Sequence, residues 1–175
     1  MPYQFVRQPL EDADQDRLVN ACQNPTEKVV VLGLLETGLR VSELSTLKVD
    51  QVQWQQRRIK VWGKGGPYGK KSKLRVIPLS DRCRAILEHH FLHRDEFGIS
   101  KRTMQRTLTR IANRAKIGAE VTPHVLRHTF AVNAVRRGIS LSSLQKILGH
   151  DRLTTTEIYL NMSPEQVLDE FHSKW

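Results

Sequence analysis

Apolar residues recur at helical spacing near both ends of the chain, whereas the middle segment alternates between apolar and polar residues. A spacing of three to four residues predicts a helix, and alternation predicts a half-buried strand. One predicted helix begins at Asn24-Pro25, contains the apolar run 29–35 and stops at Gly38. The other predicted helices cover 12–22, 41–47, 81–97, 101–116, 123–137, 141–148, 155–161 and 164–173.

The middle segment predicts a small antiparallel sheet. Its three stretches, 49–54, 58–62 and 73–78, are rich in β-branched and aromatic residues, and glycines and charged residues separate them. A long loop, GKGGPYGKKSK, connects the last two. The expected fold class is therefore α+β, mostly helical with one three-stranded antiparallel sheet. No repeat or internal boundary is visible, so we expect residues 1–175 to form one domain.

The charge balance points to an anionic partner. The chain of 175 residues has 28 Lys+Arg against 18 Asp+Glu, a formal charge of +10, whereas its hydrophobic content of 39% is ordinary. An excess of this sign favours nucleic acid. From Gln51 to Ser80 no acidic residue occurs. This span is predicted to follow a DNA backbone, the alternative being a solvated charged surface, and its basic residues are Arg57, Arg58, Lys60, Lys64, Lys70, Lys71, Lys73 and Arg75.

The apolar runs and the cysteines bear on the cellular compartment and on metal binding. No apolar run approaches the roughly 20 residues that span a bilayer, and the N-terminus lacks the apolar core of a signal peptide. Cys22 and Cys83 form no CxxC pair. We therefore expect a cytoplasmic protein without a membrane partner. A zinc site is not indicated, because no cysteine pair or HExxH pattern accompanies the histidines.

Three short patches carry side chains suited to holding a phosphate. TGLRVSEL, PHVLRH and LGH contain Arg40, His124, Arg127 and His150, and Tyr159 follows nine residues later. A guanidinium group presents a planar fork of donors that matches two phosphate oxygens. Taken singly, each residue has an ordinary explanation, such as a surface arginine or a packing tyrosine. Together they indicate chemistry on a nucleic-acid backbone, with the tyrosine as a possible nucleophile.

The order TGLR-x-SEL, GKG between two strands, PHxLRHTFA, LQxxLGH and TxxY resembles the catalytic domain of the tyrosine recombinases, also called the phage integrase family. The blocks resemble Xer-type recombinases in particular, and the match runs from about Thr37 to Tyr159. The resemblance implies a DNA strand transferase that forms a 3′-phosphotyrosyl intermediate and needs no metal or cofactor. It also implies double-stranded DNA as partner, a homotetramer on DNA or a monomer when free, and a nucleoid location.

The same resemblance assigns roles to individual residues. Arg40 and Arg127 would clamp the scissile phosphate, His124 and His150 would contact it, and Tyr159 would attack it. Lys64 would be the general acid, and Glu43 would support Arg40, although an ordinary helix ion pair is the alternative for Glu43. The loop is longer than in the family, so Lys70, Lys71 or Lys73 could be the acid instead.

Two further points bear on function. Family members normally carry an N-terminal helical domain, and we expect it to be absent here, which predicts weak DNA binding. A type IB topoisomerase and a DNA-binding module that does not cut are the alternatives. After Tyr159, apolar residues recur at helical spacing: Val167, Leu168, Phe171 and Trp175. We expect this segment either to dock on a neighbouring protomer, as in relatives, or to pack on the chain's own core.

Overall fold

The computed structural model describes residues 8–63 and 74–149. The elements in chain order are α1 (Asp12–Asn20), α2 (Pro25–Leu35), α3 (Val41–Ser45), the 3₁₀ helix η1 (Val49–Gln51), β1 (Val52–Gln53), β2 (Arg58–Trp62), β3 (Leu74–Pro78), α4 (Asp81–Phe91), α5 (Lys101–Arg114), α6 (Pro123–Arg136) and α7 (Leu141–Leu148). The predicted fold class is confirmed. In these two ranges, no helix is long and apolar enough to cross a membrane.

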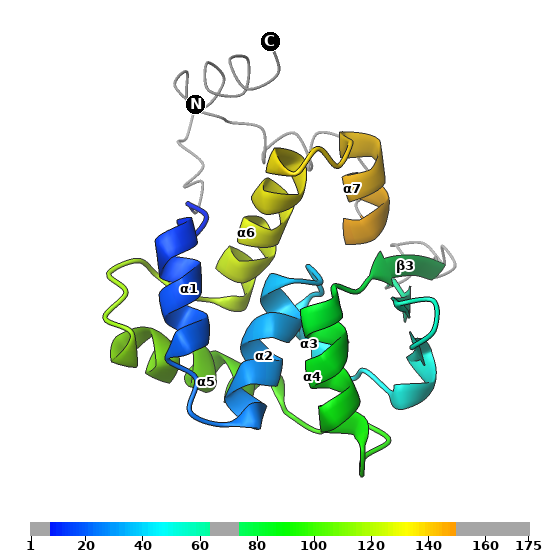
Figure 1. The fold of residues 1–175 in the computed structure, drawn as a ribbon, viewed down its shortest axis with the longest axis horizontal. Coiled ribbons are helices and arrows are strands. Elements are labelled where there is room, and N and C mark those ends of the chain that lie inside the picture. Colours follow the sequence, from blue (N-terminus) through cyan, green and yellow to red (C-terminus); the bar gives the residue numbers. More distant parts are fainter. Residues whose placement is uncertain (1–7, 64–73, 150–175) are drawn as a thin grey trace, which may run out of the picture.

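Helix α2 is the centre of the helical part (Figure 1) and contacts α1, α4, α5 and α6. Every residue from Val29 to Leu35 is buried, so this part of the helix has no polar face, as is typical of a helix surrounded by others. Its start follows the predicted signal: the Asn24 side chain accepts a hydrogen bond from the Glu27 N–H, and Pro25 occupies the first turn.

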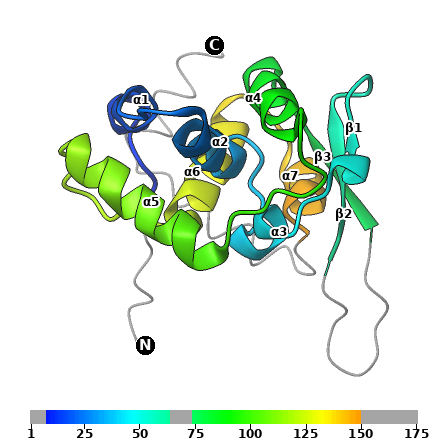
Figure 2. The same cartoon turned by 90° about the horizontal axis from the view of Figure 1, so that it is seen from below.

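The sheet lies at one side of the helices, with α7 and α4 next to it (Figure 2), and β3 contacts α7. Its order is β1-β2-β3, and both pairs are antiparallel. Ile59 pairs with Ile77, and Val61 pairs with Arg75. These residues face the core, because alternate side chains of a strand point to the same side.

Two predicted elements differ from the structure. The predicted strand 49–54 is a 3₁₀ turn followed by two strand residues, because the Lys48 N–H donates to Gln51 Oε1 at 2.8 Å and closes the turn. The predicted helix 81–97 ends at Phe91. Residues 95–97 instead pair with residues 47–49, at the start of η1, through the Val49 N–H to the Asp95 carbonyl (2.9 Å) and the Phe97 N–H to the Leu47 carbonyl (2.8 Å).

The remaining boundaries agree to within one or two residues. Helices predicted at 12–22, 41–47, 101–116 and 123–137 end slightly earlier, and 58–62 and 141–148 agree. The helices predicted at 155–161 and 164–173 lie outside the described residues, as does Lys73 at the start of the third predicted strand.

Candidate functional site

Arg40 begins helix α3 directly after a tight turn. Gly38 has a φ of +63°, and Leu39 is fully buried, so the chain is anchored immediately before the arginine. Arg40 has an extended backbone, and its N–H donates to Glu43 Oε2 at 2.8 Å. Its guanidinium donates from Nη1 to Glu43 Oε1 at 3.0 Å, while the side chain stays 41% exposed. Glu43 therefore holds the arginine and leaves its other donors accessible.

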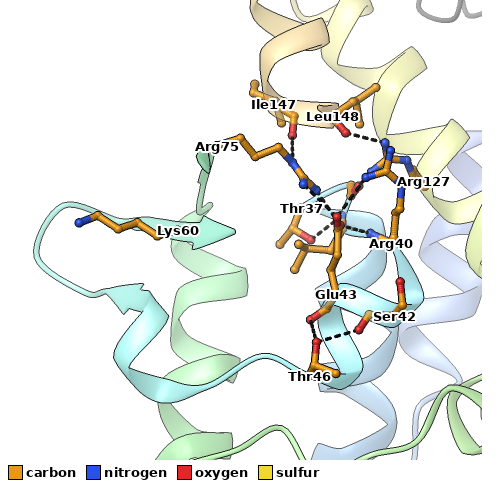
Figure 3. Close-up of polar contacts among 12 residues, drawn as sticks. Thr37, Arg40, Ser42, Glu43, Thr46, Lys60, Arg75, Arg127, Ile147 and Leu148 are labelled. Carbon is orange, nitrogen blue, oxygen red and sulfur yellow. Dashed lines mark hydrogen bonds and ion pairs between the residues drawn. The ribbon is translucent and has the colours of Figure 1, made fainter. Parts of the chain in front are cut away.

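Glu43 is shared with a second arginine, Arg75 of β3 (Figure 3). Arg75 Nη1 donates to Glu43 Oε1 at 2.9 Å and Nη2 donates to Oε2 at 2.6 Å, which makes a two-point ion pair. Its Nε donates to the Ile147 carbonyl at 2.9 Å, and its side chain is only 7% exposed. The prediction that Arg75 lies on the DNA-binding surface is therefore wrong, because β3 points it into the core.

Arg127 lies on α6 and is buried. Its Nη1 donates to the Gly38 carbonyl, and its Nη2 donates to the Leu148 carbonyl at 2.8 Å. The first bond ties α6 to the turn that precedes Arg40, and the second ties it to the end of α7. Arg40 and Arg127, the two arginines predicted to clamp the phosphate, are thus both fixed to the turn at Gly38.

Charge within this cluster favours an anion. Burial raises the pKa of Glu43, but the hydrogen bonds from Arg75 and the Arg40 N–H, together with both guanidinium charges, outweigh burial and hold this pKa below its usual range. Glu43 is therefore a carboxylate at neutral pH. One carboxylate faces Arg40 and Arg75, and Arg127 adds a third positive charge beside the turn. The cluster can accept negative charge.

His124 is exposed in the first turn of α6, which Thr122 caps by accepting from the Val125 N–H. His128, one turn later, is half-buried, and burial lowers its pKa. Helix α7 ends at Gly149, which has a φ of +68°, directly before His150. The remaining predicted site residues lie outside the described residues: His150, Tyr159, Lys64, Lys70, Lys71 and Lys73.

The predicted basic surface is partly present on the sheet. Lys60 is on β2, and its side chain points away from the arginine cluster (Figure 3). Arg57 is exposed and donates to Asp81 at 2.6 Å, and Arg58 donates to the Gln53 side chain. These three residues remain accessible to a partner, although Arg57 already shares its charge with a carboxylate.

Comparison with known proteins decides the family. The model of the phage integrase family matches residues 8–166. The chain belongs to the phage integrase family. Among its relatives, "Tyrosine recombinase XerA" of Saccharolobus solfataricus is 30% identical over 170 residues, covering 95% of this chain and 55% of the relative. "Tyrosine recombinase XerA" of Thermococcus kodakarensis is 37% identical over 153 residues, covering 81% and 52%. The chain thus spans about half the length of these relatives.

Solved structures of integrase-family proteins share the fold. A crystal structure of XerA recombinase aligns with a TM-score of 0.83 and 28% identity, covering 95% of this chain and 65% of that one. The catalytic domain of bacteriophage HP1 integrase aligns with a TM-score of 0.71 and 27% identity, covering 95% and 94%. The described fold therefore has the architecture of an integrase catalytic domain.

Reasoning from sequence missed the place of Arg75 in the cluster. The strand pattern gave no signal of this, because Leu74 and Val76 on one face of β3 are apolar, like Ile77 beside Arg75 on the other, and only the structure shows that Ile77 and Arg75 are on the buried face. The contact with the Ile147 carbonyl, 72 residues away, had no local signal.

Proposed function

We propose that this chain is the catalytic domain of a site-specific DNA recombinase or integrase, which cleaves and rejoins strands through a 3′-phosphotyrosyl intermediate. The observation that carries this proposal is the attachment of Arg40 and Arg127 to one turn, through Glu43 and the Gly38 carbonyl. Membership of a family whose named relatives are tyrosine recombinases supports it.

In the proposed reaction, the Tyr159 hydroxyl oxygen attacks the scissile phosphorus while the bond from phosphorus to the 5′ oxygen breaks. The phenol proton passes to solvent, and the departing 5′ oxygen gains a proton from the ammonium group of Lys64 or of another lysine of the same loop. The bond energy is retained in the phosphotyrosyl link, so reversal by a 5′ hydroxyl rejoins the strand without ATP.

The arginines act on the charge that develops at the phosphate. A phenol with a pKa near 10 needs a positive field to react at neutral pH. Arg40 and Arg127 supply this field and stabilise the five-coordinate phosphorane, with about 100- to 1,000-fold in rate expected from each donor. His124 and His150 are the proposed additional hydrogen-bond donors to the phosphate.

The proposed partner is double-stranded DNA, bound as a homotetramer, with the protein located at the nucleoid in the cytoplasm. Structures with the same fold support a DNA partner, because one of them is XerH bound to a palindromic difH substrate. The formal charge of +10, the exposed Arg57 and the partly exposed Arg58 and Lys60 also support it.

A nicked suicide substrate tests the nucleophile. We expect the wild-type protein to form a covalent adduct with DNA, seen as a shifted band in a denaturing gel, and Tyr159→Phe to form none because it lacks the attacking oxygen. Tyr3→Phe is the matched control and should form the adduct at the wild-type rate. A wild-type protein without an adduct, or an adduct with Tyr159→Phe, would refute the proposal. Relaxation of supercoiled DNA without a defined site would indicate a topoisomerase.

A further inference from the structure

Two arginines hold the last carbonyls of helix α7. Arg75 Nε donates to the Ile147 carbonyl at 2.9 Å, and Arg127 Nη2 donates to the Leu148 carbonyl at 2.8 Å. The last carbonyls of a helix have no partner within the helix and form its negative end, so guanidinium donors there are favourable. The end of α7 is thereby attached to both β3 and α6.

Arg75 also controls the carboxylate that holds Arg40. Both Glu43 oxygens accept from Arg75, and the same two oxygens accept from the Arg40 backbone and side chain. The Glu43 side chain is 12% exposed, so its two oxygens are fixed mainly by these four donors. Movement of Arg75 would therefore move Glu43, and Glu43 would no longer aim the Arg40 guanidinium.

Little free space surrounds Arg75. A Cβ atom added to Gly149 would lie 2.8 Å from Arg75 Cδ and 3.1 Å from its Nε. All three side-chain nitrogens of Arg75 donate to protein acceptors. A role as a direct phosphate ligand would require breaking these bonds, whereas the contacts suit a residue that acts through its neighbours.

The geometry assigns Arg75 as a positioning residue for strand cleavage: it orients Arg40 through Glu43 without touching DNA. This inference rests on the proposed function. It differs from a purely structural role, in which loss of Arg75 would lower stability and would slow cleavage by the same factor whether or not Arg40 is present.

A double-mutant cycle separates the two roles. The rate constant of adduct formation on saturating suicide substrate is measured for wild type, Arg75→Gln, Arg40→Ala and the double variant. We expect Arg40→Ala to lower it about 100- to 1,000-fold and Arg75→Gln about 100-fold, the size typical of a misplaced catalytic group. In the Arg40→Ala background, Arg75→Gln should lower the rate constant of adduct formation by less than about tenfold, because the guanidinium group that Arg75 positions is gone.

DNA affinity and stability are measured on the same proteins. We expect the dissociation constant of Arg75→Gln to stay within about twofold of wild type, so that the loss is in the rate constant of adduct formation and not in DNA binding. Arg84→Gln, which removes the partly exposed Arg84–Glu88 pair of α4, is the matched control and should cleave at the wild-type rate. If Arg75→Gln does not fold, Arg75→Lys, which keeps the charge without the two-point contact, takes its place in the cycle.

Each outcome is decisive. Equal losses from Arg75→Gln in both backgrounds would overturn the inference while leaving the proposed function intact. A parallel loss of DNA binding and cleavage in a folded variant would make Arg75 a DNA ligand and would also overturn it. A wild-type protein that forms no adduct would overturn the proposed function and this inference together.

Discussion

Gly38 occupies a position that another residue would strain. Its φ is +63°, and an added Cβ would lie 2.4 Å from Cδ1 and 2.7 Å from Cε1 of the Phe130 ring. We expect Gly38→Ala to cost about 1–2 kcal/mol for the left-handed backbone and about 1–3 kcal/mol more for overpacking. Urea unfolding measures this loss in the free energy of unfolding.

Gly118→Ala is the matched control for Gly38→Ala. An added Cβ there meets no atom within 4 Å, and Gly118 has no left-handed backbone, so its change should stay within about 0.5 kcal/mol. Because the Gly38 carbonyl accepts from Arg127, a destabilised Gly38→Ala should also cleave more slowly when fully folded. Equal stability of the two variants would mean that the turn adapts to a side chain.

For single residues, a contact within a sequence motif can be predicted from the sequence, whereas a contact between distant segments cannot. TGLRVSEL placed Arg40 and Glu43 three residues apart at a helix start, and a local pair of this kind forms as the spacing suggests. Arg127 was predicted to hold a phosphate, but its bonds to the Gly38 and Leu148 carbonyls depend on how three separate segments pack. No spacing within the chain encodes such contacts.

Helices α2 and α5 are joined by one buried carboxylate. Glu27 is 3% exposed, and its oxygens accept from Arg114 at 2.8 Å and from Arg110 at 3.2 Å, while the Gln23 N–H donates to it at 2.8 Å. The hydrogen bond from Arg114 lowers the pKa of Glu27, and burial opposes it, with the net shift downward. The positive charge of Arg110 is thus partly neutralised by Glu27.

The Glu27 carboxylate and its arginine partners make the free energy of unfolding depend on pH. Because the folded pKa of Glu27 lies below the unfolded value of about 4.3, its contribution is fully present above that value and is lost as pH falls through the folded pKa. We expect Glu27→Gln to lose about 1–3 kcal/mol of unfolding free energy at pH 7. The difference from wild type should shrink below about pH 4.

Chemical denaturation at several pH values checks the effect of Glu27→Gln. Glu88→Gln, in a partly exposed pair on α4, is the control and should change stability by less than about 1 kcal/mol at any pH. A difference between Glu27→Gln and wild type that stays constant down to pH 3 would show that the carboxylate charge is not what joins α2 and α5.

Elements were predictable where one local signal dominates. Helices α2 and α7 have a clear cap at the start, Asn24 and Ser140, and a glycine that closes the next turn, and they begin where predicted. The segments 49–51 and 92–97 were mispredicted partly because backbone hydrogen bonds join Val49 to Asp95 and Leu47 to Phe97, which are 46 and 50 residues apart in the sequence. Such pairing overrides the local preference of both segments.

The whole molecule is strongly basic, so its affinity for DNA should depend strongly on salt concentration. Neutralising each phosphate releases counterions, so the logarithm of the binding constant falls linearly with the logarithm of salt concentration. Contact with about five phosphates predicts a slope of about −4 to −5. The accessible basic residues of the sheet, Arg57, Arg58 and Lys60, are the described candidates for part of this contact.

A charge-matched pair of variants locates the contact. Lys60→Gln should weaken binding to all DNA sequences alike and reduce the slope by about 1, because one phosphate contact is lost. Lys28→Gln, on the exposed start of α2, removes the same charge and should leave the slope unchanged, since overall charge shifts affinity without removing a contact. Binding isotherms between about 50 and 200 mM salt measure both. Equal slopes for Lys60→Gln and wild type would exclude β2 from the interface, whereas equal reductions in the two variants would mean that the slope reports net charge alone.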